Sequence, residues 1–177
     1  MDHDLTKHDI LIDYLLENKF DTATIANFLK GFHLADIDFK NIMENSESEY
    51  VYSLNQKDLE ITENICLPLK RQNYFKEAFS IYKYIYLKSG PSAILYFYLY
   101  EIFACSLKFE EAISLITSAI LVCENYEKKN NTKLKDTTRF KNHWLQFMKM
   151  FSKNGSLTYL YVLADNNNFV PDFVNLD

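Results

Sequence analysis

Apolar residues recur every three to four positions along most of this chain, the spacing that places them on one face of an α-helix. The segment 92–107 differs from the others because it is apolar on all sides. Such a helix lies in the middle of a stack or carries an exposed aromatic surface. The pattern predicts an all-α protein, with helices over residues 4–18, 22–32, 55–73, 74–87, 92–107, 109–123 and 136–151.

Few turn residues separate these helices, since the chain holds only 3 Gly and 3 Pro. Asp21 or Thr22 is expected to cap the second helix, and Ser53 or Asn55 the third. The run Ser89-Gly90-Pro91 predicts a helix end and a restart, with the proline in the first turn of the next helix.

Pro68 lies inside an expected helix, where a proline removes a backbone hydrogen bond and clashes with the preceding turn. That helix should therefore bend, or a new helix should begin at Leu67-Pro68. Asp136 or Thr137 is expected to cap the last strong helix.

The length of 177 residues suits a single helical domain with its own core. Residues 35–43 predict one or two turns, 44–49 a polar linker, and 124–135 a solvated extension or loop. Residues 157–164 fit a short helix or a strand. The expected organisation is an amino-terminal helical arm at 1–45, a core at 59–126, a capping helix at 136–153 and a tail at 165–177.

A block of sequence recurs at a fixed offset in the centre of the chain. Phe75-Lys-Glu-Ala78 matches Phe109-Glu-Glu-Ala112, and the second block begins 34 positions after the first. A repeat of this length is the unit of a tetratricopeptide (TPR) array of helical hairpins. Extending the frame predicts two hairpin repeats, at 59–92 and 93–126.

The repeats resemble the TPR family on its signature positions. Ala78 and Ala112 are the most telling matches, because two helices approach closely there. The chain departs from the family at Tyr100, where Gly or Ala is preferred, at Pro91, which lies one residue late, and at Pro68. Since an array normally needs three units, the helices at 5–18 and 137–151 should act as caps. The other matching residues are Ile65, Cys66, Leu69, Tyr82, Ile85, Leu99, Phe103, Ile116 and Ala119.

The resemblance implies a protein-binding module, an adaptor or a chaperone, whose inner groove is formed by the first helix of each hairpin. That groove would capture an extended peptide or a partner helix. A looser similarity, of length, acidity and repeat spacing, is to the translocator chaperones of bacterial type III secretion. The groove residues implied by the TPR frame are Glu60, Glu63, Leu67, Lys70, Ile94, Phe97, Glu101 and Ala104.

Two other interpretations remain open at this point. Ile94 and Phe97 are equally explained as core residues covered by the amino-terminal helices. The chain is also consistent with a structural or self-associating protein, in which the amino-terminal arm and the aromatic helix form a homodimer interface. A peptide-sensing regulator or inhibitor is a further class, although residues 22–43 offer few side chains that read DNA bases.

Charge and composition narrow the partners. The formal net charge of −5 gives no reason to expect nucleic acid, and the most apolar run, 93–107, is too short to span a membrane. Three widely spaced cysteines and no apolar leader favour the cytoplasm. Lys128, Lys129, Lys133 and Lys135 form the stronger of two basic clusters and would suit an acidic partner.

The sequence offers no convincing catalytic or cofactor chemistry. His3, His8, His33 and His143 form no metal-binding pair and are expected at the surface or at helix ends. Cys105 and Cys123 fall on apolar faces, where a thiol acts as a small core group. No glycine-rich loop could hold a phosphate. We therefore expect a protein that is not an enzyme and uses no cofactor or metal.

Overall fold

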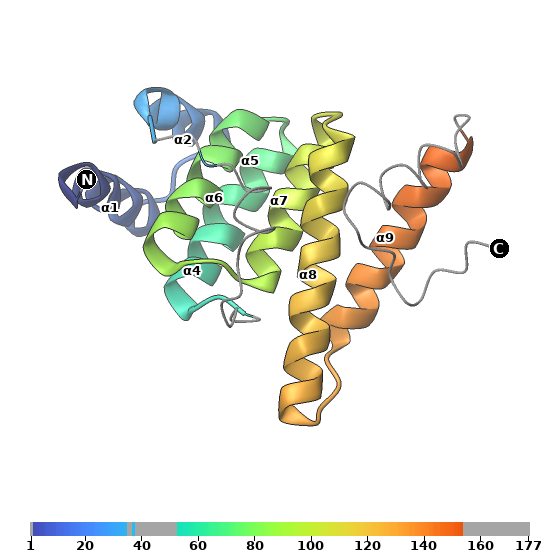
Figure 1. The fold of residues 1–177 in the computed structure, drawn as a ribbon. Helices are drawn as coiled ribbons and strands as arrows, with labels where there is room; N and C mark the ends of the chain where they lie inside the picture. Colours follow the sequence, from blue (N-terminus) through green and yellow to red (C-terminus); the bar gives the residue numbers. More distant parts are fainter. Residues whose placement is uncertain (1, 35–36, 38–52, 154–177) are drawn as a thin grey trace.

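The computed structural model describes residues 2–34, 37 and 53–153, and the regular elements within these ranges are helices (Figure 1). The predicted all-α class is confirmed. The helices are α1 (Asp2–Glu17), α2 (Thr22–Phe28), η1 (Leu29–Gly31), α4 (Gln56–Ile61), η2 (Thr62–Cys66), α5 (Leu67–Arg71), α6 (Phe75–Ser89), α7 (Ala93–Cys105), α8 (Phe109–Asn130) and α9 (Lys135–Lys153).

The helices form a stack that follows the order of the chain, with α1 and α2 at one end and α9 at the other (Figure 1). α1 packs on α4, η2 and α6, while α9 packs on α8. The aromatic helix α7 lies between α6 and α8, which explains why it is apolar on all sides. Of the two positions that the sequence left open for this helix, the middle of the stack and an exposed aromatic surface, the structure has the first.

Side-chain caps set the start of three helices. The carboxylate of Asp21 accepts a hydrogen bond from the Thr24 N–H at 2.7 Å, and the Asn55 side chain accepts one from the Asp58 N–H at 2.8 Å. The Ser92 hydroxyl accepts one from the Leu95 N–H at 3.1 Å. Ser92 is thus the cap of α7, and Pro91 precedes the helix, contrary to the expectation that the proline would lie in its first turn.

Pro68 is accommodated by a wider turn of helix just before it. Residues Thr62–Cys66 form a π-helical segment, and the N–H of Leu67 bonds to the carbonyl of Thr62, five residues earlier. The backbone stays helical through Cys66 and Leu67, and Pro68 follows this wider turn directly. The chain thus accommodates Pro68 without the break in the helix that one of the two predicted outcomes required.

Two hairpins use the same turn, 34 positions apart. In the first, the Tyr74 N–H bonds to the Leu69 carbonyl at 2.9 Å, and Asn73 has a φ of 67°. In the second, the Lys108 N–H bonds to the Phe103 carbonyl at 2.9 Å, and Leu107 has a φ of 62°. This is the Schellman arrangement, in which one left-handed residue closes the helix. The sequence repeat is therefore also a repeat of backbone geometry.

Leu107 is poorly suited to its turn, and replacing it should stabilise the protein. A left-handed backbone costs a residue with a Cβ about 1–2 kcal/mol, and asparagine tolerates it better than leucine. The Leu107 side chain is 73% exposed, so little packing is lost with it. We expect Leu107→Asn to raise the free energy of unfolding by about 1 kcal/mol in urea titrations. Asn73→Leu, at the matching position, should lower the free energy of unfolding by a similar amount. Changes of the same sign in the two variants would contradict the assignment of these turns.

Two boundaries near the carboxyl end differ from expectation. α8 continues to Asn130, so most of the polar segment 124–135 is helix, ended by Asn131 in the left-handed conformation. α9 begins at Lys135, which places Asp136 and Thr137 inside its first turn, where they are not caps. Three segments with sequence predictions lie outside the described residues: 35–43 apart from residue 37, the linker 44–49, and the carboxyl-terminal part 157–177.

Candidate functional site

The predicted groove residues lie on two neighbouring helical segments. Glu60 is on α4, Glu63 on η2, and Leu67 and Lys70 on α5. The other four, Ile94, Phe97, Glu101 and Ala104, follow one side of α7. An ion pair links the two segments, since the Lys70 Nζ lies 2.8 Å from a carboxylate oxygen of Glu101. Both of these side chains are about four-fifths covered, so the pair fixes the distance between the segments.

Ile94 and Phe97 do not line an open groove. Their side chains are buried, with 6% and 4% exposure. The ring of Phe97 stacks on Phe140 of α9, with centroids 4.4 Å apart and planes 17° apart. The edge of the His143 ring also meets Phe97, at 4.9 Å. Phe97 is thus a core residue, as one of the two interpretations expected. The helix that covers it is α9, and not the amino-terminal helices as that interpretation assumed.

Tyr98 is a residue of this region that the repeat frame did not single out. Its ring stacks on Tyr82 at 5.8 Å with nearly parallel planes. Burial raises the pKa of the Tyr98 phenol, Arg139 acts in the opposite direction, and Glu101 and Glu63 add to the rise. The charges of three helical segments thus converge on one aromatic side chain that is half-buried.

Arg139 supplies the positive side of this surface. Its guanidinium lies over the rings of Phe97 and Phe140, 4.8 Å and 5.3 Å from their centroids. It also approaches Asp136, at 3.3 Å. Arg139 precedes Phe140 directly and lies four positions before His143 in the sequence, but the sequence did not show which side of α7 the helix α9 covers. We call Glu63, Lys70, Tyr98, Glu101 and Arg139 the mixed-charge face.

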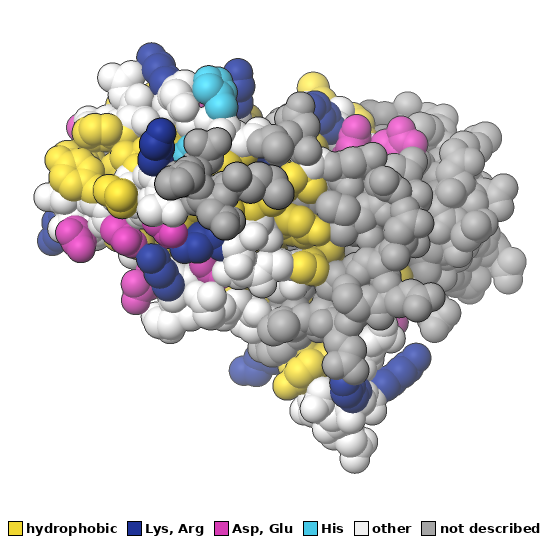
Figure 2. Space-filling model, turned by 60° about the vertical axis from the view of Figure 1, so that its left-hand side comes forward, with side chains coloured by type: hydrophobic (Ala, Val, Ile, Leu, Met, Phe, Trp, Pro, Cys, Tyr) yellow, Lys and Arg dark blue, Asp and Glu magenta, His cyan; other side chains and the backbone are white. Residues whose placement is uncertain are grey.

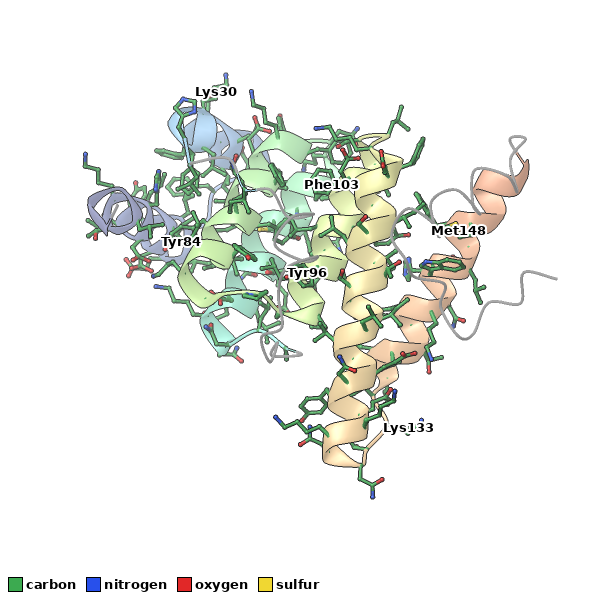
Figure 3. All side chains as sticks on the ribbon, in the orientation of Figure 1. Lys30, Tyr84, Tyr96, Phe103, Lys133 and Met148 are labelled. Atoms are coloured by element: carbon green, nitrogen blue, oxygen red, sulfur yellow. The ribbon has the colours of Figure 1, made fainter. Side chains whose placement is uncertain are left out.

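The amino-terminal arm is fixed to the core by a separate polar cluster. Asp9 of α1 accepts hydrogen bonds from the Tyr84 hydroxyl and the Lys88 ammonium of α6 (Tyr84 is labelled in Figure 3). Partial burial opposes ionisation of Asp9, but the bonds from Lys88 and Tyr84 outweigh it and lower the pKa of the carboxyl. This cluster joins helices far apart in sequence and explains how α1 is held in place.

The cysteines and histidines do not assemble a reactive centre in the described residues. Cys66 and Cys123 are buried, and burial raises the pKa of both thiols, that of Cys123 to about 12. Cys105 is exposed, contrary to the expectation of a core position, because it lies in the last turn of α7 beside the hairpin turn. His8 packs on the ring of Phe32 at 4.0 Å.

The described residues contain no group of three or more His, Cys, Asp or Glu side chains placed to hold a metal ion. The four lysines of the basic cluster are exposed around the turn between α8 and α9, where Figure 3 labels Lys133. Lys128 and Lys129 lie in the last turn of α8, where positive charge stabilises the helix dipole. This accounts for Lys128 and Lys129, but not for Lys133 in the turn or Lys135 at the start of α9.

Comparisons with known proteins found no match: no protein-family model, no curated protein and no solved structure matches the chain. In the described part of the chain, no helix is both long enough and apolar enough to cross a membrane.

Proposed function

We propose that this chain is a non-enzymatic protein-binding scaffold, an adaptor or chaperone built on two TPR-like hairpins. The observation that carries the proposal is the duplicated turn, with matching hydrogen bonds and a left-handed residue, Asn73 or Leu107, at equivalent positions 34 apart. Burial supports it as well, since the residues on the TPR signature positions are buried, apart from the half-buried Phe103. Helical hairpins of this kind serve as peptide-binding surfaces.

The proposed contact surface is the mixed-charge face together with Glu60. A partner segment lying along it would place an apolar side chain against the exposed part of Tyr98, since half-buried aromatic residues act as anchors. Basic residues of the partner would meet Glu60 and Glu63, which are exposed. Because Lys70 and Glu101 neutralise each other, they fix the surface more than they select the partner.

Charge reversal at Glu63 should separate binding from folding. Glu63 is exposed, so Glu63→Lys leaves the core intact while it repels a basic partner segment. We expect the amount of partner captured from a lysate of the native host to fall at least about tenfold. Tyr98→Ala should weaken capture as well. Quantitative mass spectrometry of the bound proteins measures both effects.

The matched control is Glu111→Lys, the same change at an exposed carboxylate in the first turn of α8. It should leave the captured proteins unchanged. Far-ultraviolet circular dichroism checks that all three variants are folded. If Glu63→Lys and Glu111→Lys retain the same partners at the same level, the mixed-charge face is not the binding surface.

A further inference from the structure

The outer side of α1 exposes apolar residues at the free end of the helical stack. Ile10 is 66% exposed and Tyr14 46%, and Phe28 of α2 beside them is 42% exposed. The Tyr14 ring contacts Phe28 and Phe20 at centroid distances of 6.0 Å and 5.5 Å. Figure 2 shows hydrophobic side chains gathered at this end of the molecule, with charged ones beside them. The terminal element of a helical array normally has a polar outer face, so this surface calls for a partner.

The charges that flank these residues indicate which partner fits. Lys7, Ile10, Tyr14 and Glu17 follow one another at intervals of three and four positions, so they form one stripe along α1. All four are exposed. Neither Lys7 nor Glu17 joins an ion pair among the described residues. The stripe therefore has a positive end, an apolar centre and a negative end.

Because its two ends carry opposite charges, this stripe is complementary to a second copy of itself that runs in the opposite direction. If two copies of α1 lie antiparallel about a twofold axis, Ile10 of one copy meets Tyr14 of the other. Lys7 then meets Glu17, and the same pair forms again on the other side of the axis. The two ion pairs would be separated by roughly 15 Å along the helices, at 1.5 Å per residue. Twofold interfaces require this kind of self-complementarity.

We propose that the chain forms a homodimer through antiparallel packing of α1 on α1, with Ile10 and Tyr14 at its centre and Lys7–Glu17 pairs at its two ends. Phe28 extends the apolar area on each side, next to an open hollow of about 270 Å³ lined by Thr24, Asn27 and Phe28. The rim charges set the register and the apolar residues supply most of the affinity. This dimer does not depend on the proposed peptide binding.

Two charge reversals test the register. In Glu17→Lys, a lysine meets Lys7 at both ends of the dimer, and in Lys7→Glu a glutamate meets Glu17. We expect each single variant to raise the dimer dissociation constant at least about tenfold, since like charges in contact disfavour association. The double variant Lys7→Glu/Glu17→Lys restores both pairs and should dimerise like the unchanged chain. Sedimentation velocity over a range of concentrations measures the constant for each.

The sharpest outcome comes from mixing the two single variants. One copy then carries only positive charge on its stripe and the other only negative charge, so a heterodimer with two good pairs should form at concentrations at which neither single variant dimerises. Leu107→Asp, at an exposed leucine far along the chain, is the control and should leave the dimer intact. A chain that sediments at 20.9 kDa at every concentration, or a mixture that stays monomeric, overturns the proposal.

Discussion

Replacing Phe97 with alanine should lower the free energy of unfolding by about 3–5 kcal/mol, the usual cost of removing a buried phenylalanine. Its ring is 4% exposed and is covered by Phe140, with Arg139 and His143 around it. The loss should concentrate on α9, because the ring lies where this helix meets α7. Urea titration measures the total, and hydrogen exchange of the α9 amides shows where protection is lost.

Leu87→Ala is the control, since that side chain is 41% exposed, lies outside the proposed dimer interface and should cost far less. A double-mutant cycle between Phe97 and Phe140 isolates the stacked pair, which should be worth about 0.5–1.5 kcal/mol beyond its buried area. A loss below about 1 kcal/mol for Phe97→Ala would contradict the coverage of this ring by α9. For the same reason an aspartate at Phe97 would test stability and not partner binding.

The helical class and the two matching turns were the parts of the fold that could be predicted most fully from the sequence. The sequence blocks that begin at Phe75 and Phe109 each follow the same kind of turn in the structure. The geometry of such a turn is local, because its hydrogen bonds join residues within a stretch of six. The π-helical turn before Pro68 was predicted only as a choice between a bend and a restart. That choice depends on how the rest of the helix packs, which the local sequence does not specify.

The candidate site was less predictable, because it depends on which helix covers which side of α7. The family frame placed Lys70 and Glu101 on neighbouring first helices, and these residues do form an ion pair. The same frame could not show that α9 covers Phe97, since α9 lies outside the repeats. Arg139 and Tyr98 became visible as site residues only once α9 was in position.

Alkaline conditions should destabilise the protein strongly, because its core holds several groups that resist losing a proton. Burial raises the pKa of Cys66 and of Tyr82 beside it well above the ordinary values of 9.0 and 10.0. Burial also raises the pKa of Cys123 and Tyr100 to about 12 each. The native state therefore keeps protons that the unfolded chain releases.

The sign of the effect follows from this difference in bound protons. Below the ordinary pKa of each group both states are protonated, and the free energy of unfolding does not depend on pH through it. Above that value each buried group lowers the free energy of unfolding by about 1.4 kcal/mol per pH unit until its native pKa is reached. Stability should begin to fall near pH 9 through the thiols, and faster above pH 10 as the phenols join them.

Urea titrations between pH 7 and pH 11 should show a total loss on the order of 5 kcal/mol or more, comparable to the whole stability of a small domain. The double variant Cys66→Ala/Cys123→Ala should delay the onset to about pH 10, because the tyrosines alone would then remain to titrate. Tyr82→Phe should instead leave the onset near pH 9 and reduce the slope above pH 10. A profile that stays flat to pH 11, or one that the double alanine variant does not alter, would show that these thiols and phenols are not held in the core.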